Sequence, residues 1–227
     1  MNRATWLLTM RREDERQEDE LAPDYDARWS DTDETHQVFV ARFLSLLPPG
    51  GAVLDAACGT GRFFSRVIAS GRSLVGVDHA ARALAIAQAK APQARTEQHD
   101  LQDLPYFNEF DGVMCVDAME FVPPEEWPVV LTRFRQALRP GGSFYLTVEL
   151  TPEDQVRARN GEMRRRGLPV VDGEVIWGDV DGYYHFYPSM EQVRSWIAEA
   201  GFAIEDEIEG PWHGEEYAYH HVLARVR

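Results

Sequence analysis

Cysteine, lysine and long apolar runs are all scarce in this sequence of 227 residues. The two cysteines, Cys58 and Cys115, are too few for a disulfide framework or a cysteine-rich zinc site, so we expect free thiols in a reducing compartment. No stretch approaches the roughly 18 apolar residues that span a membrane. The apolar patch at residues 6–8 is also too short for the core of a secretory signal. These absences predict a soluble, cytoplasmic protein without a membrane partner.

Basic residues are outnumbered, 23 against 38 acidic ones, which gives a formal net charge of −15. This charge repels phosphate backbones, so no nucleic-acid partner is expected. Lys90 is the single lysine, and the arginine bias hints at GC-rich coding and a bacterial source. The length suits one sizeable core and leaves little room for a second full domain.

The chain divides into a charged N-terminal arm and one domain. Residues 1–22 include the run "RREDERQEDE" and lack hydrophobic periodicity, which favours a loose, solvated or partly helical arm without a functional role. Residues 23–227 form the domain. An apolar periodicity at residues 35–47 predicts a packed helix there, with Asp33 or Thr35 as its N-cap.

Strand-like and helix-like segments alternate from residue 52 to residue 150. The predicted strands are "AVLDAA", "SLVGVD", "ARTEQHD", "FDGVMCV" and "SFYLTVEL", and the predicted helices are "GRFFSRVIAS", "ARALAIAQAKA" and residues 124–138. This alternation indicates right-handed βαβ units, and therefore an α/β fold with a doubly wound parallel sheet and helices on both faces. Ligands should bind beyond the carboxyl ends of the strands.

The alternation is interrupted at about residues 151–185. This segment contains an arginine cluster, "RARNGEMRRRG", and the stretch "LPVVDGEVIWGDVDG", which could form a small hairpin. A structureless loop of this length is unusual in a compact domain, so we expect a lid-like insertion. Beyond it, residues 189–200 predict a helix capped by Ser189 and ended by Gly201. Two strands follow, joined by a turn near residues 211–214.

The loop "DAACGTGRFF" follows the first predicted strand and opens a helix. Gly59 and Gly61 allow a ligand to approach the backbone closely, and the helix N-terminus adds a slightly positive end. A dinucleotide fingerprint has a third glycine, for close helix packing, where this sequence has the obstructing side chain of Phe64. Asp55 would repel a pyrophosphate but suits an ammonium group. The loop therefore favours a cationic or zwitterionic cofactor.

Two further aspartates end predicted strands near this loop. Asp78 lies 17 residues beyond Gly61, where a carboxylate can accept hydrogen bonds from both hydroxyls of a ribose. Asp100 suits an adenine amino group, and Leu101 offers a backbone amide and an apolar wall. Together these residues indicate that the ligand is a nucleoside.

The segments "VLDAACGTGR", "VGVDHA", "HDLQDLP", "FDGVMCVDAMEFVP" and "LRPGGSFYLTV" occur in an order and spacing that resemble the motifs of class I, Rossmann-like S-adenosylmethionine-dependent methyltransferases. The resemblance covers about residues 25–150 and extends through the last helix and strand pair. It implies a mostly parallel seven-stranded sheet with an antiparallel last strand. It also implies S-adenosylmethionine as cofactor and methyl transfer to O, N or C of a small molecule, mainly by in-line positioning.

The resemblance further implies a set of cofactor-binding residues at the carboxyl ends of the first four strands. Those at the first strand would hold the methionine part, those at the second the ribose, and those at the third and fourth the adenine and the pocket edge. In chain order they are Asp55, Ala56, Gly59, Gly61, Asp78, His79, Asp100, Leu101, Val116 and Asp117. Tyr25, in "PDYDARW", matches a tyrosine that often closes over the methionine end in related enzymes.

Methyl transfer from a sulfonium needs alignment and exclusion of water, and needs a base only where the acceptor must lose a proton. His185, in "YYHFYP", and Glu149, at the end of the fifth strand, are the candidate catalytic bases. Further candidates after the fourth strand and in the last strand are Asp117, Glu120, His220 and His221. Because neighbouring strand residues face opposite sides, at most one of the last two reaches a given pocket.

Aromatic residues are dense in residues 177–219, where they either line a pocket for a flat or cationic acceptor or pack in the core. The arginine cluster either binds a carboxylate or phosphate or forms a solvated helix face. No Asp-Asn pair occurs, as a catechol-type metal site would require, so we expect no metal.

Other functions stay open at this level. A regulatory protein that binds S-adenosylmethionine or S-adenosylhomocysteine without catalysis would have the same cofactor residues. A nicotinamide-dependent oxidoreductase would share a similar fold, although Phe64 and Asp55 disfavour it. The acidity disfavours a nucleic-acid acceptor, and the sequence does not indicate the acceptor or the oligomeric state.

Overall fold

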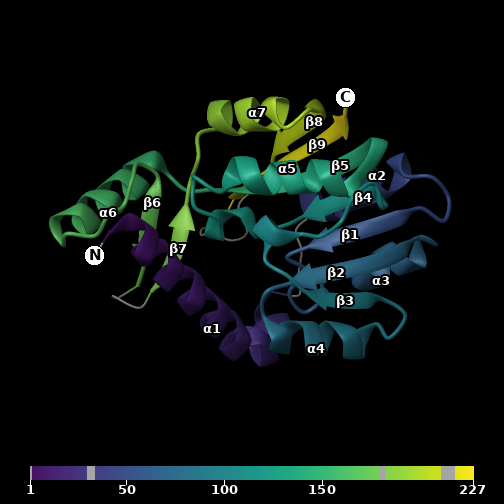
Figure 1. The fold of residues 1–227 in the computed structure, drawn as a ribbon, viewed down its shortest axis with the longest axis horizontal. Helices are drawn as coiled ribbons and strands as arrows, with labels where there is room; N and C mark the ends of the chain where they lie inside the picture. Colours follow the sequence, from purple (N-terminus) through teal and green to yellow (C-terminus); the bar gives the residue numbers. More distant parts are fainter. Residues whose placement is uncertain (1, 30–33, 179–181, 211–217) are drawn as a thin grey trace.

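The computed structural model describes residues 2–29, 34–178, 182–210 and 218–227. Its centre is a seven-stranded sheet in the order β3-β2-β1-β4-β5-β9-β8 (Figure 1). In chain order the strands are β1 (Ala52–Ala56), β2 (Ser73–Asp78), β3 (Arg95–Gln98), β4 (Phe110–Cys115), β5 (Leu138–Leu150), β8 (Phe202–Glu209) and β9 (Ala218–Val226). Strands β1 to β5 pair in parallel, and β9 is antiparallel to both β5 and β8. The α/β, doubly wound, mostly parallel sheet with an antiparallel last strand is confirmed.

Helices cover both faces of this sheet. On one face lie α2 (Glu34–Leu46), α3 (Phe64–Ala69) and α4 (Ala81–Lys90), and on the other lie α5 (Trp127–Ala137) and α7 (Met190–Glu199). The strands alternate accordingly: in β1, Val53 packs with the first group and Leu54 with the second. Two 3₁₀ turns, η1 (Leu101–Asp103) and η2 (Met119–Phe121), follow β3 and β4.

The caps of these helices agree in part with the sequence. Ser189 caps α7, because its Oγ accepts a hydrogen bond from the Gln192 amide at 3.2 Å. Gly201 follows with a φ of +90°, a conformation suited to a helix end. Thr35 lies inside α2 and is not its cap, whereas Asp33 and the turn at residues 211–214 lie outside the described residues.

The N-terminal segment differs from the loose arm that the sequence predicts. Residues 3–22 belong to a single helix, α1 (Arg3–Trp29), which continues past the expected boundary at residue 22. Figure 1 shows α1 running diagonally across the molecule from β7 to α4. Trp6, near its start, is 1% exposed, and its ring lies edge-on to Tyr184 with centroids 5.8 Å apart.

The first turn of α1 is held by an ion pair with the insertion. The Arg3 guanidinium donates to both carboxylate oxygens of Glu174, at 2.8 and 2.7 Å, and to the Pro169 carbonyl at 2.7 Å. Glu174 is fully buried and also accepts from the Tyr184 hydroxyl at 2.6 Å. Buried charges need such partners, so this network explains why a highly charged segment is ordered.

The insertion is built from α6 (Glu153–Arg165), β6 (Glu174–Trp177) and β7 (Tyr183–Phe186). Strands β6 and β7 form a separate antiparallel sheet in which Trp177 pairs with Tyr183. A hairpin does form, but its second strand lies beyond residue 182, where the sequence predicts the hairpin to end. The arginine cluster lies on α6, and Arg164 and Arg165 are exposed, as on a solvated helix face. Along the described residues, no helix has the length and apolar character needed to cross a bilayer.

Candidate functional site

A cavity of about 1520 Å³ opens at the carboxyl ends of the parallel strands. Four strands each contribute a carboxyl group to the cavity wall at or just after their carboxyl ends. These groups are Asp55 in β1, Asp78 in β2, Asp117 after β4 and Glu149 in β5. Parallel strands bring their carboxyl ends to one edge, so residues far apart in the sequence meet here. Further wall residues come from α1 and β7.

The loop between β1 and α3 follows backbone conformations that glycine adopts easily. Gly59 and Gly61 have φ angles of +51° and +77°. Phe64 stands where a dinucleotide fingerprint has its third glycine, and its ring occupies the space above Gly76 of β2. A Cβ at residue 76 would lie 2.3 Å from Cζ of that ring. The small residue that allows α3 to approach the sheet is therefore in the strand.

Asp55 is a buried carboxyl group without a full set of partners. It is 2% exposed, and among the described residues its Oδ2 has no hydrogen-bond partner. Burial raises its pKa to about 7, the Asp78 charge adds to this shift, and Arg62 opposes it. A cationic group entering the cavity would satisfy this oxygen.

Asp78 holds the glycine loop in place. Its Oδ2 accepts from the Gly59 amide at 2.8 Å, and its Oδ1 accepts from the Ala80 amide at 2.9 Å. Burial raises its pKa, although His79 and the backbone amides oppose the shift. Each oxygen keeps capacity for a second hydrogen bond from a ligand hydroxyl.

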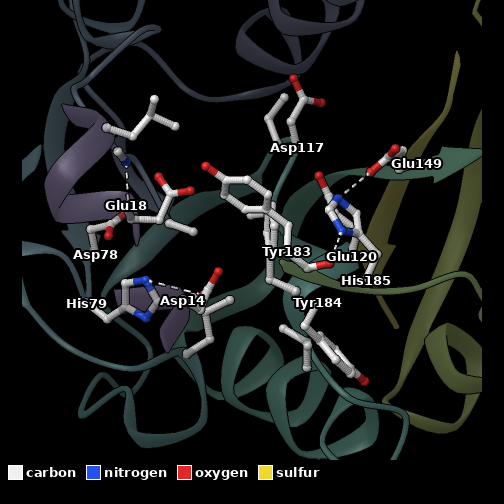
Figure 2. Close-up of a pocket in the computed structure, with 18 of the residues that line it drawn as sticks. Asp14, Glu18, Asp78, His79, Asp117, Glu120, Glu149, Tyr183, Tyr184 and His185 are labelled. Carbon is white, nitrogen blue, oxygen red and sulfur yellow. Dashed lines mark hydrogen bonds and ion pairs between the residues drawn. The ribbon is translucent and has the colours of Figure 1, made fainter. Parts of the chain in front are cut away.

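Two acidic residues of α1 face this part of the cavity (Figure 2). Asp14 lies 3.6 Å from His79, and Glu18 lies beside Asp78 in the same view. Burial and the Asp78 charge raise the pKa of Glu18 to about 7, and burial with the surrounding carboxylates raises that of Asp14. The helix that begins in the expected N-terminal arm thus forms part of the cavity wall beside the end of β2.

Asp117 is fully engaged by neighbouring side chains. It accepts from Arg62 at 2.5 Å, interacts with Nε2 of His36 at 2.9 Å and accepts from Thr147 at 3.0 Å. Burial alone would raise its pKa, but Arg62 and His36 outweigh burial and hold the pKa well below the usual range. Its own φ is +54°, an uncommon conformation for a non-glycine residue that occurs at functional sites. Asp117 therefore fixes Arg62 at the cavity wall.

The opposite end of the cavity combines carboxyl groups with aromatic rings. Glu149 Oε2 lies 3.5 Å from Nε2 of His185, and Glu149 Oε1 accepts from the Tyr187 hydroxyl at 3.2 Å. Burial raises the pKa of Glu149 to about 8 and lowers that of His185 to about 4. The imidazole is therefore neutral at pH 7. Figure 2 shows Glu149 and His185 facing each other, with Glu120 nearby.

Most residues that the sequence singled out meet in this one cavity. Those that line it are Tyr25, Asp55, Gly59, Asp78, His79, Asp100, Leu101, Val116, Asp117, Glu120, Glu149 and His185. Ala56 and Gly61 do not line it. Among the described residues neither histidine of the last strand lines it: His220 interacts with Glu207 at 2.9 Å, and His221 interacts with Tyr145 at 2.9 Å.

Sequence reasoning missed the contributions of Asp14 and Glu18 in α1, of Arg62 and of His36. The sequence did contain a signal for Arg62, because this residue directly follows Gly61 in the glycine loop, which was already expected to bind a ligand. His36 carried no signal, because its partner Asp117 lies 81 residues away.

Comparisons with known proteins agree with this geometry. Residues 53–142 match the family model of a methyltransferase domain. An uncharacterized methyltransferase from Synechocystis is 35% identical over 101 residues, which cover 44% of this chain and 48% of that protein. A demethylmenaquinone methyltransferase from Symbiobacterium thermophilum is 28% identical over 219 residues, with 83% and 84% covered. The chain spans about half the length of the first curated relatives that it matches.

Solved structures share the fold at low sequence identity. An S-adenosylmethionine-dependent methyltransferase from Methanosarcina mazei aligns with a TM-score of 0.70 at 16% identity, covering 80% of this chain and 95% of that one. Magnesium protoporphyrin IX methyltransferase from Synechocystis, with bound S-adenosylmethionine, aligns with a TM-score of 0.62 at 19% identity, covering 86% and 79%. Residues 53–142 therefore belong to a methyltransferase domain, and the chain shares the fold of S-adenosylmethionine-dependent methyltransferases of known structure.

Proposed function

We propose that this protein transfers a methyl group from S-adenosylmethionine to O, N or C of a small-molecule acceptor, mainly by in-line positioning. One observation carries the proposal: Asp55, Asp78 and the loop at Gly59 stand together in a single cavity at the carboxyl ends of β1 and β2.

The residues present fit this cofactor. The unpartnered, buried Oδ2 of Asp55 suits the ammonium group of a methionine. The spare hydrogen-bonding capacity of Asp78 suits the hydroxyls of a ribose. An excess of carboxyl groups at the wall suits a ligand with a positive sulfonium and disfavours a pyrophosphate.

The other predicted cofactor residues are assigned by their positions. Asp100 and Leu101, at the start of η1, would flank the adenine, and Val116 would form the edge at β4. Tyr25 would close the methionine end from α1. Because Asp117 is held by Arg62 and His36, we assign it to positioning Arg62 rather than to direct contact with the cofactor.

The acceptor would bind at the end of the cavity near β7. A methyl group on a bound sulfonium is already activated, so alignment and exclusion of water supply much of the rate. We assign exclusion of water to β6 and β7 of the insertion, which reach the cavity wall through Trp177, Tyr183 and His185. Where the acceptor must lose a proton, His185 and Glu149 are the candidate bases. The aromatic rings there favour an aromatic or cationic acceptor. A cytoplasmic location, a bacterial source and independence from metals stay predictions.

Titration calorimetry with S-adenosylmethionine and S-adenosylhomocysteine tests the proposal. Wild type should bind both, and Asp78→Ala should weaken binding by about 10- to 100-fold, as expected for lost hydrogen bonds to a charged group. Asp172→Ala is the matched control, because the side chain of Asp172 is 96% exposed. No binding by wild type, with Asp78→Ala unchanged, would refute the proposal. Binding without turnover over a broad acceptor panel would favour a non-catalytic regulatory protein.

A further inference from the structure

Two buried glutamates stand at the acceptor end of the cavity. Glu120 lies in η2, just beyond β4, and Glu149 lies near the end of β5, the neighbouring strand. Both line the cavity, and each is 4% exposed. Among the described residues the Oε2 atom of Glu120 has no hydrogen-bond partner. An unpartnered carboxyl oxygen at this depth is costly unless a ligand satisfies it.

The cavity offers these glutamates little positive charge of its own. Within the described residues its wall has eight carboxyl groups but three guanidinium groups. Each guanidinium has another carboxylate partner: Arg62 pairs with Asp117, Arg11 with Glu126, and Arg28 lies 4.0 Å from Asp24. His185, next to Glu149, is neutral at pH 7 because burial lowers its pKa to about 4. The described part of the wall therefore leaves Oε2 of Glu120 open to a cationic ligand.

Several groups determine the charge on the pair. Glu120 interacts electrostatically with Glu149, with Asp117 and, favourably, with Arg62. The phenols of Tyr25 and Tyr219 also lie within range. Burial first, and then the Glu149 and Asp117 charges, raise the pKa of Glu120, while burial raises that of Glu149 to about 8. The pair thus holds protons in the absence of a cation and would release them when a cation arrives.

Aromatic rings surround the same position. The His185 ring stacks on Tyr187 with centroids 5.8 Å apart, and Phe121 lies 4.9 Å from His185. Tyr183 and Trp177 continue this wall. Aromatic faces attract cations and also accommodate apolar substituents around a charged nitrogen. Carboxyl groups inside an aromatic wall match an organic ammonium better than a phenol, a carboxylate or a phosphate.

We propose that the acceptor is an amine, whose protonated nitrogen binds between Glu120 and Glu149, and that methylation takes place on this nitrogen. The proposal rests on the methyltransferase function proposed above and assigns the substrate class of the same cavity. Glu120 is then a catalytic residue, because it touches the reacting nitrogen.

The reaction balances with these groups alone and the methyl donor. The ammonium gives one proton to the Glu120 carboxylate, which frees the lone pair of the nitrogen. The nitrogen then forms a bond to the methyl carbon while the carbon–sulfur bond breaks and its electron pair stays on sulfur. The products are a methylated ammonium and a neutral thioether. No oxidant, reductant or metal is required.

Matched probes test the substrate class on the S-adenosylhomocysteine-loaded protein. The first set consists of benzylamine, benzyl alcohol and benzoate. Equivalent sets carry a phenethyl, cyclohexylmethyl or n-butyl group. Within each set, the compounds differ in the functional group that would meet Glu120. The amines should bind at least 10-fold more tightly than their alcohols and should release about one proton, measured by calorimetry in buffers of different ionisation enthalpy. Methyl transfer from radiolabelled S-adenosylmethionine should be restricted to amines.

Glu120→Gln provides the second arm. It should weaken amine binding by about 10- to 100-fold and leave alcohol and S-adenosylhomocysteine binding within twofold. The control, Glu191→Gln, alters an exposed carboxylate on α7. Alcohols or carboxylates binding as well as amines, or no amine binding to a protein that binds S-adenosylhomocysteine, would overturn the proposal. If Glu120→Gln lowered only the affinity for S-adenosylmethionine, Glu120 would belong to the cofactor site, and the amine proposal would also be overturned. Loss of S-adenosylhomocysteine binding by wild type would instead refute the methyltransferase function.

Discussion

Replacing Gly76 by alanine should destabilise the protein because of a single aromatic ring. A Cβ at this position would lie 2.3 Å from Cζ and 2.8 Å from Cε1 of Phe64, and 2.9 Å from Sγ of Cys58, whereas ordinary contacts are 3.4–4 Å. Phe64 is 1% exposed, so its ring has no solvent-facing position to move to. Overpacking of this kind costs about 1–3 kcal/mol. For a chain of this length, that loss lowers Tm by about 2–4 °C for each kcal/mol.

The double variant Gly76→Ala/Phe64→Leu isolates the cause. Leucine removes the outer ring atoms that collide, so the double variant should be at least about 1 kcal/mol more stable than the sum of the two single effects. Urea unfolding followed by circular dichroism measures this coupling. Gly161→Ala is the control: its Cβ would meet one atom, Nη1 of Arg165 at 3.6 Å, and it should stabilise α6 by about 0.5–1 kcal/mol. Strictly additive effects at Gly76 and Phe64 would refute the packing argument.

Three further predictions concern charged groups. Folding raises the pKa of Glu149 from its ordinary value of 4.5 to about 8, so its stabilising contribution is full below pH 4.5 and is lost as pH rises to 8. Glu149→Gln should therefore gain stability over wild type by about 4 kcal/mol at pH 8 and by about 1 kcal/mol at pH 5, and equal urea midpoint differences at both would contradict this. Glu174→Gln should cost about 3–5 kcal/mol in urea unfolding because it breaks the buried pair with Arg3, and a change within 0.5 kcal/mol (roughly the scatter of surface substitutions) would show that the pair is unimportant. Asp55→Asn should weaken S-adenosylmethionine binding by about 10- to 100-fold in calorimetry without lowering Tm, and unaltered affinity would remove Asp55 from the cofactor site.

The central sheet could be predicted from the sequence because each of its strands is encoded locally. "SLVGVD" combines a short apolar run with a following helix, and its last residue, Asp78, lies at the cavity as expected. The same logic succeeds at Asp55. These positions follow from strand direction alone, because parallel strands must end at one edge of the sheet.

The parts that could not be predicted depend on partners distant in the sequence. The α1 sequence is polar and contains Pro23, so its pattern indicates neither a stable helix nor a buried face. What orders it, the pairing of Arg3 with Glu174, joins residues 171 positions apart. The pairing of Arg62 with Asp117 spans 55 positions and is equally invisible in local periodicity. Partners of this kind emerge from tertiary structure.

The α1 helix reaches from Glu174 in the insertion to the aspartate at the end of β2, and this span constrains the N-terminal coding sequence in an unusual way. Because an α-helix turns by about 100° and advances by about 1.5 Å with each residue, one residue inserted between Arg3 and Asp14 would turn one of them away from its partner, Glu174 or His79. Many exposed side chains along this helix could be exchanged freely. The number of residues could not be changed, because the contacts at the two ends of the helix require a fixed length and a fixed rotation between them.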